Sequence, residues 1–208
     1  MKGVFVTGTD TGIGKTFVAA CLVRAWRADY WKPVQTGLNE DEGDTITVGR
    51  LAEAAPERLH PPAHALQEPL SPHLAAGREG VSLSLDDFKP PRTSAPLVVE
   101  GAGGLLVPLN DDAFIIDLIA HLRLPVVLVA RSTLGTINHT LLSLEALKRR
   151  DLPVAGVVMN GPANADNRAA IEHFGGVRVL AEVPPMTATP ESVAEVAVKL
   201  PAFESLFS

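Results

Sequence analysis

The sequence predicts an open α/β fold, in which a mostly parallel, doubly wound sheet carries helices on both faces. Short apolar runs rich in valine alternate along the chain with longer amphipathic segments rich in alanine and leucine. Continuous apolar runs are typical of parallel strands covered on both faces, and strand–helix repetition with right-handed crossovers builds a doubly wound sheet. Residues 1–208 show no linker and no repeat, so a single domain is expected.

Six strands are expected from the apolar runs. The first run is followed at once by a glycine-rich turn, and the later runs are bounded by glycine, proline or asparagine. The six runs cover residues 4–7, 30–34, 97–100, 126–130, 154–160 and 177–183.

Six helices are expected between and after these strands. Asp44 can cap the second helix, Gly175-Gly176 ends the fifth, and Pro190 begins the last. The proline-rich segment 56–72 has no regular pattern, and we expect it to wrap the surface and to line a site. The helices cover residues 15–28, 45–55, 114–122, 137–150, 166–174 and 190–200.

Composition excludes several classes of function. Acidic residues outnumber basic residues by 24 to 18, and the net charge of −6 argues against a broad surface for nucleic acid or membrane. The single cysteine, Cys21, excludes an intrachain disulfide and is expected in the core. No apolar stretch is long enough to span a membrane and no secretory signal is evident, so a cytoplasmic location is expected.

A phosphate-binding loop is predicted directly after the first strand. The segment Gly8-Thr9-Asp10-Thr11-Gly12-Ile13-Gly14-Lys15-Thr16 lies between a strand and a helix, as a P-loop requires. Its backbone N–H groups would point at phosphate oxygens, Lys15 would reach the outer phosphates, and the Thr16 hydroxyl would bind Mg²⁺. Five residues separate Gly8 from Gly14, one more than in the standard pattern.

Two carboxylates are candidates for the same metal. Glu100 closes the third predicted strand, and ligands bind beyond the carboxyl ends of strands in open α/β sheets. A carboxylate there is a poor core residue but a good oxygen ligand. Asp44 could be a second ligand, a helix cap, or both.

Polar residues also follow the other predicted strands. Lys32 lies within the second predicted strand and Thr36 comes just past it, although alone they are compatible with an ordinary strand-edge lysine and a turn threonine. Asn160 could hydrogen-bond a base edge or simply form a turn, and Pro184-Pro185 could wall a base. Residues 132–139 form a polar helix start that could hold an anion.

Taken together and in chain order, these motifs resemble those of the dethiobiotin synthetase family. The resemblance spans nearly the whole chain, and the long P-loop is itself typical of that family. One departure is Gly12, where some members carry glutamate, and another is the short link at residues 27–30. The motifs lie at residues 8–16, 31–37, 68–73, 99–104 and 134–139.

The resemblance implies a homodimeric ligase of biotin biosynthesis that uses ATP, Mg²⁺ and CO₂ to close a ureido ring on 7,8-diaminononanoate. One amine would capture CO₂ as a carbamate, whose oxygen would attack the γ-phosphate. The second amine would then attack the resulting carbamic–phosphoric anhydride, releasing phosphate and forming dethiobiotin.

The resemblance also implies roles for individual residues. The catalytic residues are Lys15, Lys32 and Thr11. The metal ligands are Thr16, Asp44 and Glu100. The ATP site comprises Gly12, Ile13, Gly14, Lys15, Thr16, Phe17, Asp44, Glu100, Asn160 and Pro184. The diamine site comprises Thr36, Gly103, Gly104, Gly135, Thr136, Ile137 and Asn138. Of these, residues 136–138 would come from the partner subunit.

Three other classes of P-loop protein are alternatives. A partitioning or membrane-site-selecting switch usually has a second lysine early in its P-loop, and residues 9–13 contain none. A cobyrinate-type amidotransferase needs a glutaminase cysteine, which Cys21 in the first helix cannot supply. A small-molecule kinase would carry an arginine-bearing lid, and residues 56–72 contain only Arg58.

Overall fold

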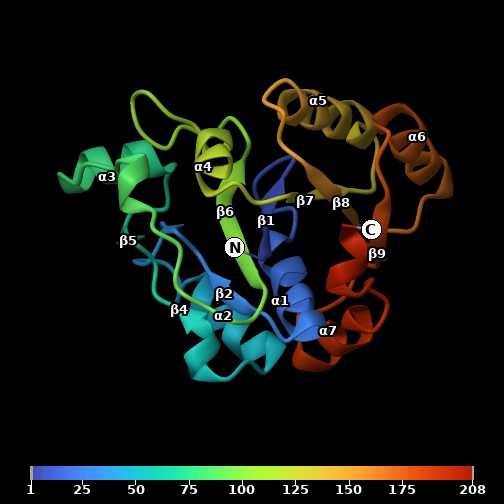
Figure 1. Cartoon of the computed structure of the whole chain (residues 1–208), viewed down its shortest axis with the longest axis horizontal. Coiled ribbons are helices and arrows are strands. Elements are labelled where there is room, and N and C mark those ends of the chain that lie inside the picture. Colours follow the sequence, from blue (N-terminus) through green and yellow to red (C-terminus); the bar gives the residue numbers. More distant parts are fainter. Residues whose placement is uncertain (1, 208) are drawn as a thin grey trace.

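The computed structural model, which describes residues 2–207, has a central seven-stranded sheet with helices on both faces (Figure 1). The strand order is β4-β2-β6-β1-β7-β8-β9, and neighbouring strands run parallel. This confirms the predicted fold class. The strands are β1 (Gly3–Gly8), β2 (Asp29–Trp31), β4 (Leu59–His60), β6 (Leu97–Gly104), β7 (Val126–Arg131), β8 (Val154–Asn160) and β9 (Val179–Val183).

Helices cover both faces of this sheet and bury two separate apolar clusters. Along β1, Val4 and Val6 belong to the cluster beneath α1, α2 and α7, whereas Phe5 belongs to the cluster beneath α4, α5 and α6. Cys21 lies in the first cluster, as predicted. The helices are α1 (Lys15–Trp26), α2 (Asp44–Ala52), α3 (Pro72–Glu79), α4 (Ile115–Leu122), α5 (Thr136–Lys148), α6 (Ala165–Gly175) and α7 (Pro190–Ala197).

The second predicted strand, residues 30–34, is wrong as a single element. Strand β2 ends at Trp31, and β3 (Val34–Gln35) pairs instead with β5 (His64–Ala65) in a separate two-stranded sheet. Pro33 has no N–H group with which to continue the ladder, and its carbonyl accepts from Ala63 N at 2.9 Å. The break leaves Lys32 directly after the carboxyl end of β2, at the same edge of the sheet at which the P-loop follows β1.

Segment 56–72 is more regular than predicted. It contains a short 3₁₀ helix (Pro56–Arg58) and the strands β4 and β5, and it leads into α3, which the sequence pattern did not reveal. Strands of two residues carry too little periodicity to be recognised. The last residues of the segment line a cavity beside the P-loop, as expected of it.

Helix ends differ from the predictions by a few residues, and the Asp44 cap is wrong. Helix α1 ends at Trp26 because Arg27 adopts a left-handed conformation (φ 49°), and α2 ends at Ala52 because Glu53 does the same (φ 50°). Gly43 occupies the N-cap of α2, and Asp44 is its first residue, which frees its carboxylate for other partners. Within residues 2–207, every helix is too short or too polar to cross a bilayer.

Candidate active site

The P-loop connects the carboxyl end of β1 to the start of α1. Gly14 is the N-cap of α1 with φ 91°, a conformation that side-chain-bearing residues rarely adopt. A Cβ atom at Gly14 would also lie 2.2 Å from Asn160 Nδ2, so the close contact between the loop and β8 requires glycine. The loop therefore places the N-terminal N–H groups of α1 at the carboxyl edge of the sheet, where they can bind a phosphate.

Lys15 is buried beneath this loop. Its ammonium donates to the backbone carbonyl of Asp10 at 3.2 Å. Burial lowers the pKa of Lys15, and the positive charge of Lys32 lowers it further against the pull of the nearby carboxylates. A phosphate group bound at the loop would favour the charged form and would stabilise the ammonium in place.

Three oxygen donors converge next to Lys15. The Thr16 hydroxyl of α1 lies 2.9 Å from Asp44 Oδ1 of α2 and 2.9 Å from Glu100 Oε1 of β6. Oxygen ligands from a hydroxyl and carboxylates suit Mg²⁺, which keeps several waters and usually takes further ligands from substrate phosphates. The three predicted metal residues are thus brought together, and their chemistry fits the ion.

Lys32 forms ion pairs with both carboxylates. Its ammonium lies 2.5 Å from Asp44 Oδ2 and 3.3 Å from Glu100 Oε1, and it donates to the Gly101 carbonyl at 3.2 Å. Burial acts to lower the pKa of Lys32, but the charges of Glu100 and Asp44 outweigh it, so the pKa is raised. Lys32 is therefore a fixed positive charge that points into the site.

The pKa values of the two carboxylates are shifted in opposite directions. Burial raises the pKa of Glu100, which is only 1% exposed, and the charge of Lys32 does not fully offset this effect. Burial also acts on Asp44, but the charge of Lys32 and the hydrogen bonds from Lys32 and Thr16 hold its pKa below the usual range. Tyr30 supports the more buried carboxylate by donating to Glu100 Oε2 at 2.9 Å.

A cavity of about 470 Å³ lies beside the P-loop tip. Thr11, Thr36 and Gly103, all predicted to act on the diamine or its carbamate, line it together. Gly103 has φ +67°, and a Cβ atom there would lie 2.7 Å from Val107 Cγ2, so glycine keeps this wall open. The cavity is further lined by Gly37, Glu40, Asp41, Pro69, Leu70, Ser71, Pro72, Ala102 and Val107.

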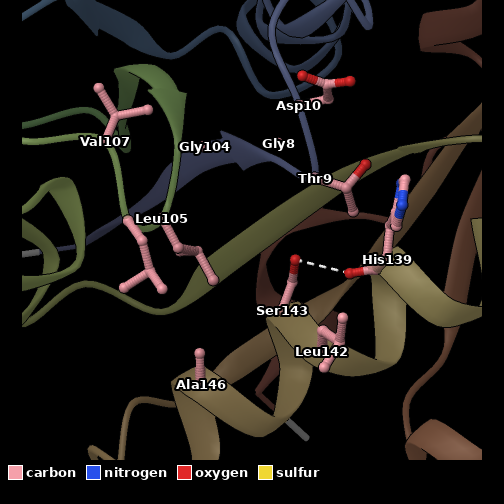
Figure 2. A pocket seen from close by; sticks show the side chains of 11 residues that line it. Gly8, Thr9, Asp10, Gly104, Leu105, Val107, His139, Leu142, Ser143 and Ala146 are labelled. Carbon is pink, nitrogen blue, oxygen red and sulfur yellow. Dashed lines mark hydrogen bonds between the residues drawn. The ribbon is translucent and has the colours of Figure 1, made fainter. Parts of the chain in front are cut away.

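A second hollow lies between the P-loop, the end of β6 and α5 (Figure 2). Apolar side chains form most of its wall, and Ser143 donates to the carbonyl of His139 at 2.8 Å within it. Gly104 lines this hollow together with Gly8, Thr9 and Asp10. Gly104, predicted in the diamine site, thus faces a different space from Gly103.

The remaining predicted diamine residues lie at the start of α5. Gly135 is its left-handed N-cap (φ 91°), and the buried Thr136 hydroxyl donates to the carbonyl of Arg131. Ile137 is half-buried and Asn138 is exposed. None of these four residues lines the cavity of Thr11 and Thr36, so a single chain does not bring the two groups together.

The remaining predicted ATP-site residues lie at the ends of β8 and β9 and on α1. Asn160, the last residue of β8, donates from Nδ2 to the Ile13 carbonyl at 2.8 Å, which commits its amide N–H to the loop. Pro184 follows β9 and is exposed. Phe17 is half-buried on α1 and packs against the apolar cluster on that face, so only its backbone is suited to a phosphate.

Several residues that shape the site were not predicted. Gln35 accepts from Asp44 N at 2.9 Å, and Arg131 forms an ion pair with Asp10 at 2.8 Å. Tyr30 precedes Lys32 by two residues, and alternation along a strand could have placed both on one face. No signal in the sequence distinguishes Gln35 or Arg131 from ordinary polar residues.

A glycine-rich loop after the first strand ends in Lys-Thr at the start of a helix, next to one carboxylate from β6 and one from the start of α2; this arrangement defines a P-loop nucleotide-binding protein. The sequence family described as "AAA domain" (AAA_26) matches residues 2–192. A ParA family ATPase from Chlorobium tepidum TLS superposes with a TM-score of 0.55 at 12% identity, covering 95% of this chain and 98% of that one. The cell division ATPase MinD of Pyrococcus furiosus gives 0.51 at 18% identity, covering 99% and 97%. At these identities the likeness concerns the fold alone.

Sequence relatives are far more similar. The chain is 61% identical to the ATP-dependent dethiobiotin synthetase of Paramagnetospirillum magneticum, over 90% of each chain. It is 55% identical to that of Brucella ovis, over 87% of this chain and 85% of the relative. It is also 59% identical over its whole length to a biotin biosynthesis bifunctional protein of Bordetella avium, of which it spans 45%. The chain belongs to the ATP-dependent dethiobiotin synthetase family, as its motifs predicted.

Proposed function

We infer that the chain carries out the reaction of its family: ATP-dependent closure of a ureido ring on 7,8-diaminononanoate with CO₂, giving dethiobiotin, ADP and phosphate. One observation supports placing this chemistry at the carboxyl ends of the central strands. Two buried lysines, Lys15 of the P-loop and Lys32 after β2, converge on the carboxylates Asp44 and Glu100, and Lys32 also donates to the Gly101 carbonyl, next to Ala102 in the cavity wall. Phosphoryl transfer needs positioning and charge neutralisation rather than a covalent protein group.

The first step takes place in the cavity. One neutral amine adds to the carbon of CO₂ and loses a proton to solvent, which leaves a carbamate anion. Thr11 and Thr36 are placed to donate hydrogen bonds to its oxygens, and Lys32 supplies the opposite charge. Lys32 is suited to this role because its raised pKa keeps it protonated.

The next two steps exchange bonds at phosphorus and carbon. A carbamate oxygen forms a bond to the γ-phosphorus while the bond from that phosphorus to the leaving ADP oxygen breaks. Lys15 and Lys32 stabilise the charge on the transferring group. The second amine then attacks the carbamoyl carbon, the bond to phosphate oxygen breaks, and the amine loses a proton as the ring closes.

Thr16, Asp44 and Glu100 would hold Mg²⁺ in this scheme. The ion would neutralise charge on the phosphate oxygens and orient them for in-line transfer. Tyr30 and Gln35 keep the two carboxylates in place, through the Glu100 carboxylate and the backbone N–H of Asp44 respectively.

The carboxylate tail of the diamine is assigned to the start of α5 in a partner subunit, which makes the enzyme a homodimer. Support comes from the separation of residues 135–138 from the cavity within one chain. Support also comes from Leu106, Leu134 and Leu142, which are 58%, 101% and 56% exposed, since large exposed apolar side chains are typical of interfaces. Light scattering should report a dimer that Leu142→Glu weakens. A cytoplasmic location is part of the same proposal.

Diamine-dependent phosphate release tests the function directly. The enzyme is mixed with MgATP and bicarbonate, with and without 7,8-diaminononanoate, and phosphate and product mass are followed together. We expect phosphate release to require the diamine and to match dethiobiotin in amount. Phosphate release that ignores the diamine would contradict the assignment and would favour a nucleotide-driven switch.

A further inference from the structure

The tip of the P-loop is exposed and is held at only a few points. Residues 10–12 are exposed, whereas Ile13 on one side and Gly8 on the other are buried. Gly12 has φ +69°, and no atom lies within 4 Å of where its Cβ atom would be. A tip with so few contacts depends on its anchors for the position of Thr11, the residue assigned to the reacting oxygens.

One anchor lies on the helix side of the tip. Asn160 at the end of β8 donates to the Ile13 carbonyl at 2.8 Å, and Ile13 itself is 5% exposed. The Ile13 side chain packs so closely on Gly8 that a Cβ atom there would lie 2.5 Å from Ile13 Cδ1.

The other anchor lies on the strand side of the tip. Arg131, the last residue of β7, places Nη2 2.8 Å from Asp10 Oδ2. The other Asp10 oxygen accepts from Thr11 N at 2.7 Å, and the Asp10 carbonyl accepts from Lys15 Nζ at 3.2 Å. Asp10 therefore connects Arg131 to two residues that are assigned to catalysis.

The two anchors form one structural unit. Arg131 and Asn160 are register partners at the carboxyl ends of the adjacent strands β7 and β8. The two strand ends thus hold the loop on both sides of Thr11 and Gly12. Because both strands belong to the central sheet, the loop tip takes its position from a rigid element.

Asp10 also poses an electrostatic problem that Arg131 offsets. A carboxylate in a phosphate-binding loop repels a bound triphosphate, and the loop is otherwise built to attract anions. We propose that Arg131 is a positioning residue, which neutralises Asp10 and holds the P-loop tip so that a nucleoside triphosphate binds and Thr11 faces the reacting oxygens. The proposal rests on the proposed function only for the identity of the reacting groups.

Direct binding of MgATP tests the proposal independently of turnover. The full-length Arg131→Ala variant should bind MgATP about tenfold more weakly in calorimetry, the size of a lost charge-assisted hydrogen bond. Arg131→Lys keeps the charge and should recover part of the loss. Asp10→Asn in the Arg131→Ala background removes the uncompensated charge and should also restore binding. Arg149→Ala, which removes an exposed arginine that pairs with Glu145 on α5, is the matched control.

Kinetics and melting separate positioning from folding. The Arg131–Asp10 pair is exposed, with side chains 41% and 53% accessible, so the melting temperature should stay near that of the wild type. In turnover, the KM for ATP should rise and kcat should fall, with the KM for the diamine unchanged. Two results would overturn the proposal: MgATP binding by Arg131→Ala equal to that of the Arg149→Ala control, or no recovery in the double variant. Wild-type enzyme that binds MgATP but ignores the diamine would overturn the proposed function instead.

Discussion

Two parts of the site are held in place in different ways. The buried cluster beneath the P-loop consists of Lys32, Asp44 and Glu100, and the rim around the loop tip consists of Arg131 and Asn160. In the cluster, Lys32 and Glu100 are almost fully buried, and Lys32 has two carboxylate partners within 3.3 Å. At the rim, Arg131 and Asn160 each hold the loop by a single contact near solvent. A buried charge that loses its partner destabilises the folded protein by several kcal/mol, so removing one member disrupts the whole cluster. At the rim, one contact can be lost while the other is retained. Chemistry is thus assigned to the part that the fold fixes and recognition to the part that adjusts.

Removing Lys32 should have the largest effect. Lys32→Ala leaves Asp44 and Glu100 facing each other without their shared cation and removes a charge from the reacting oxygens. We expect kcat to fall by about 10²–10³-fold, while the dissociation constant for ATP changes far less. Steady-state kinetics and calorimetry measure the two quantities. Lys199→Ala, at an exposed position just after α7, is the control, and an equal loss in kcat and ATP affinity would argue against a role at the reacting oxygens.

Neutralising Glu100 comes next. Glu100→Gln removes one charge from the predicted metal ligands and keeps one oxygen acceptor, which can serve either the Tyr30 hydroxyl at Oε2 or the Lys32 ammonium at Oε1. The Mg²⁺ concentration for half-maximal rate should rise by about tenfold or more. A magnesium titration at saturating ATP measures this shift. An unchanged titration would remove Glu100 from the metal site and would leave the cluster as a purely structural ion pair.

Truncating Asn160 at the rim should act on binding alone. Asn160→Ala removes the hydrogen bond to the Ile13 carbonyl, and with it the side-chain oxygen that we predict to face the base, so the KM for ATP should rise by about tenfold. The kcat at saturating ATP should stay within about twofold of wild type, because the buried lysines are untouched and Arg131 still holds the Thr11 side of the loop tip through Asp10. A fall in kcat as large as that of Lys32→Ala would erase the difference between cluster and rim.

The last prediction concerns stability rather than activity, at the buried thiol of Cys21 in α1. Burial raises the pKa of Cys21 to about 12, against a usual value of 9.0. The folded chain keeps this proton while the unfolded chain loses it, so the free energy of unfolding should fall as pH rises from 9 towards 12, by about 1.4 kcal/mol per pH unit. Urea unfolding of wild type and Cys21→Ala across this window measures the difference in slope. Equal pH dependence of the two free energies of unfolding would show that burial in α1 does not raise the pKa of the Cys21 thiol.

Much of the fold and the cluster could be predicted because each signal is local and strong. Valine-rich runs gave the sheet, and Gly8 to Thr16 identified the P-loop from chemistry that needs glycine, lysine and threonine in fixed order. Glu100 was recognisable because it ends an apolar run, although β6 itself continues to Gly104. Asp44 was found as a metal candidate, although its expected cap proved wrong once Gly43 took that position.

The remaining features depend on contacts between residues distant in sequence. The break at Pro33 depends on whether the chain pairs with β4 or β5, which no local pattern decides. Arg131 pairs with Asp10 across 121 positions, and an exposed arginine carries no signal of its partner. The rim was therefore less predictable than the cluster, because each of its residues holds the loop through a single contact that only the folded chain brings together.

A paired kinetic measurement tests the central claim most directly. Diamine-dependent phosphate release by Lys32→Ala and Asn160→Ala is followed over a full range of ATP concentrations, beside the wild type. The buried cluster carries the chemistry if Lys32→Ala loses kcat at near-normal ATP affinity while Asn160→Ala loses affinity at near-normal kcat. The same pattern of loss in both variants would contradict this division between cluster and rim.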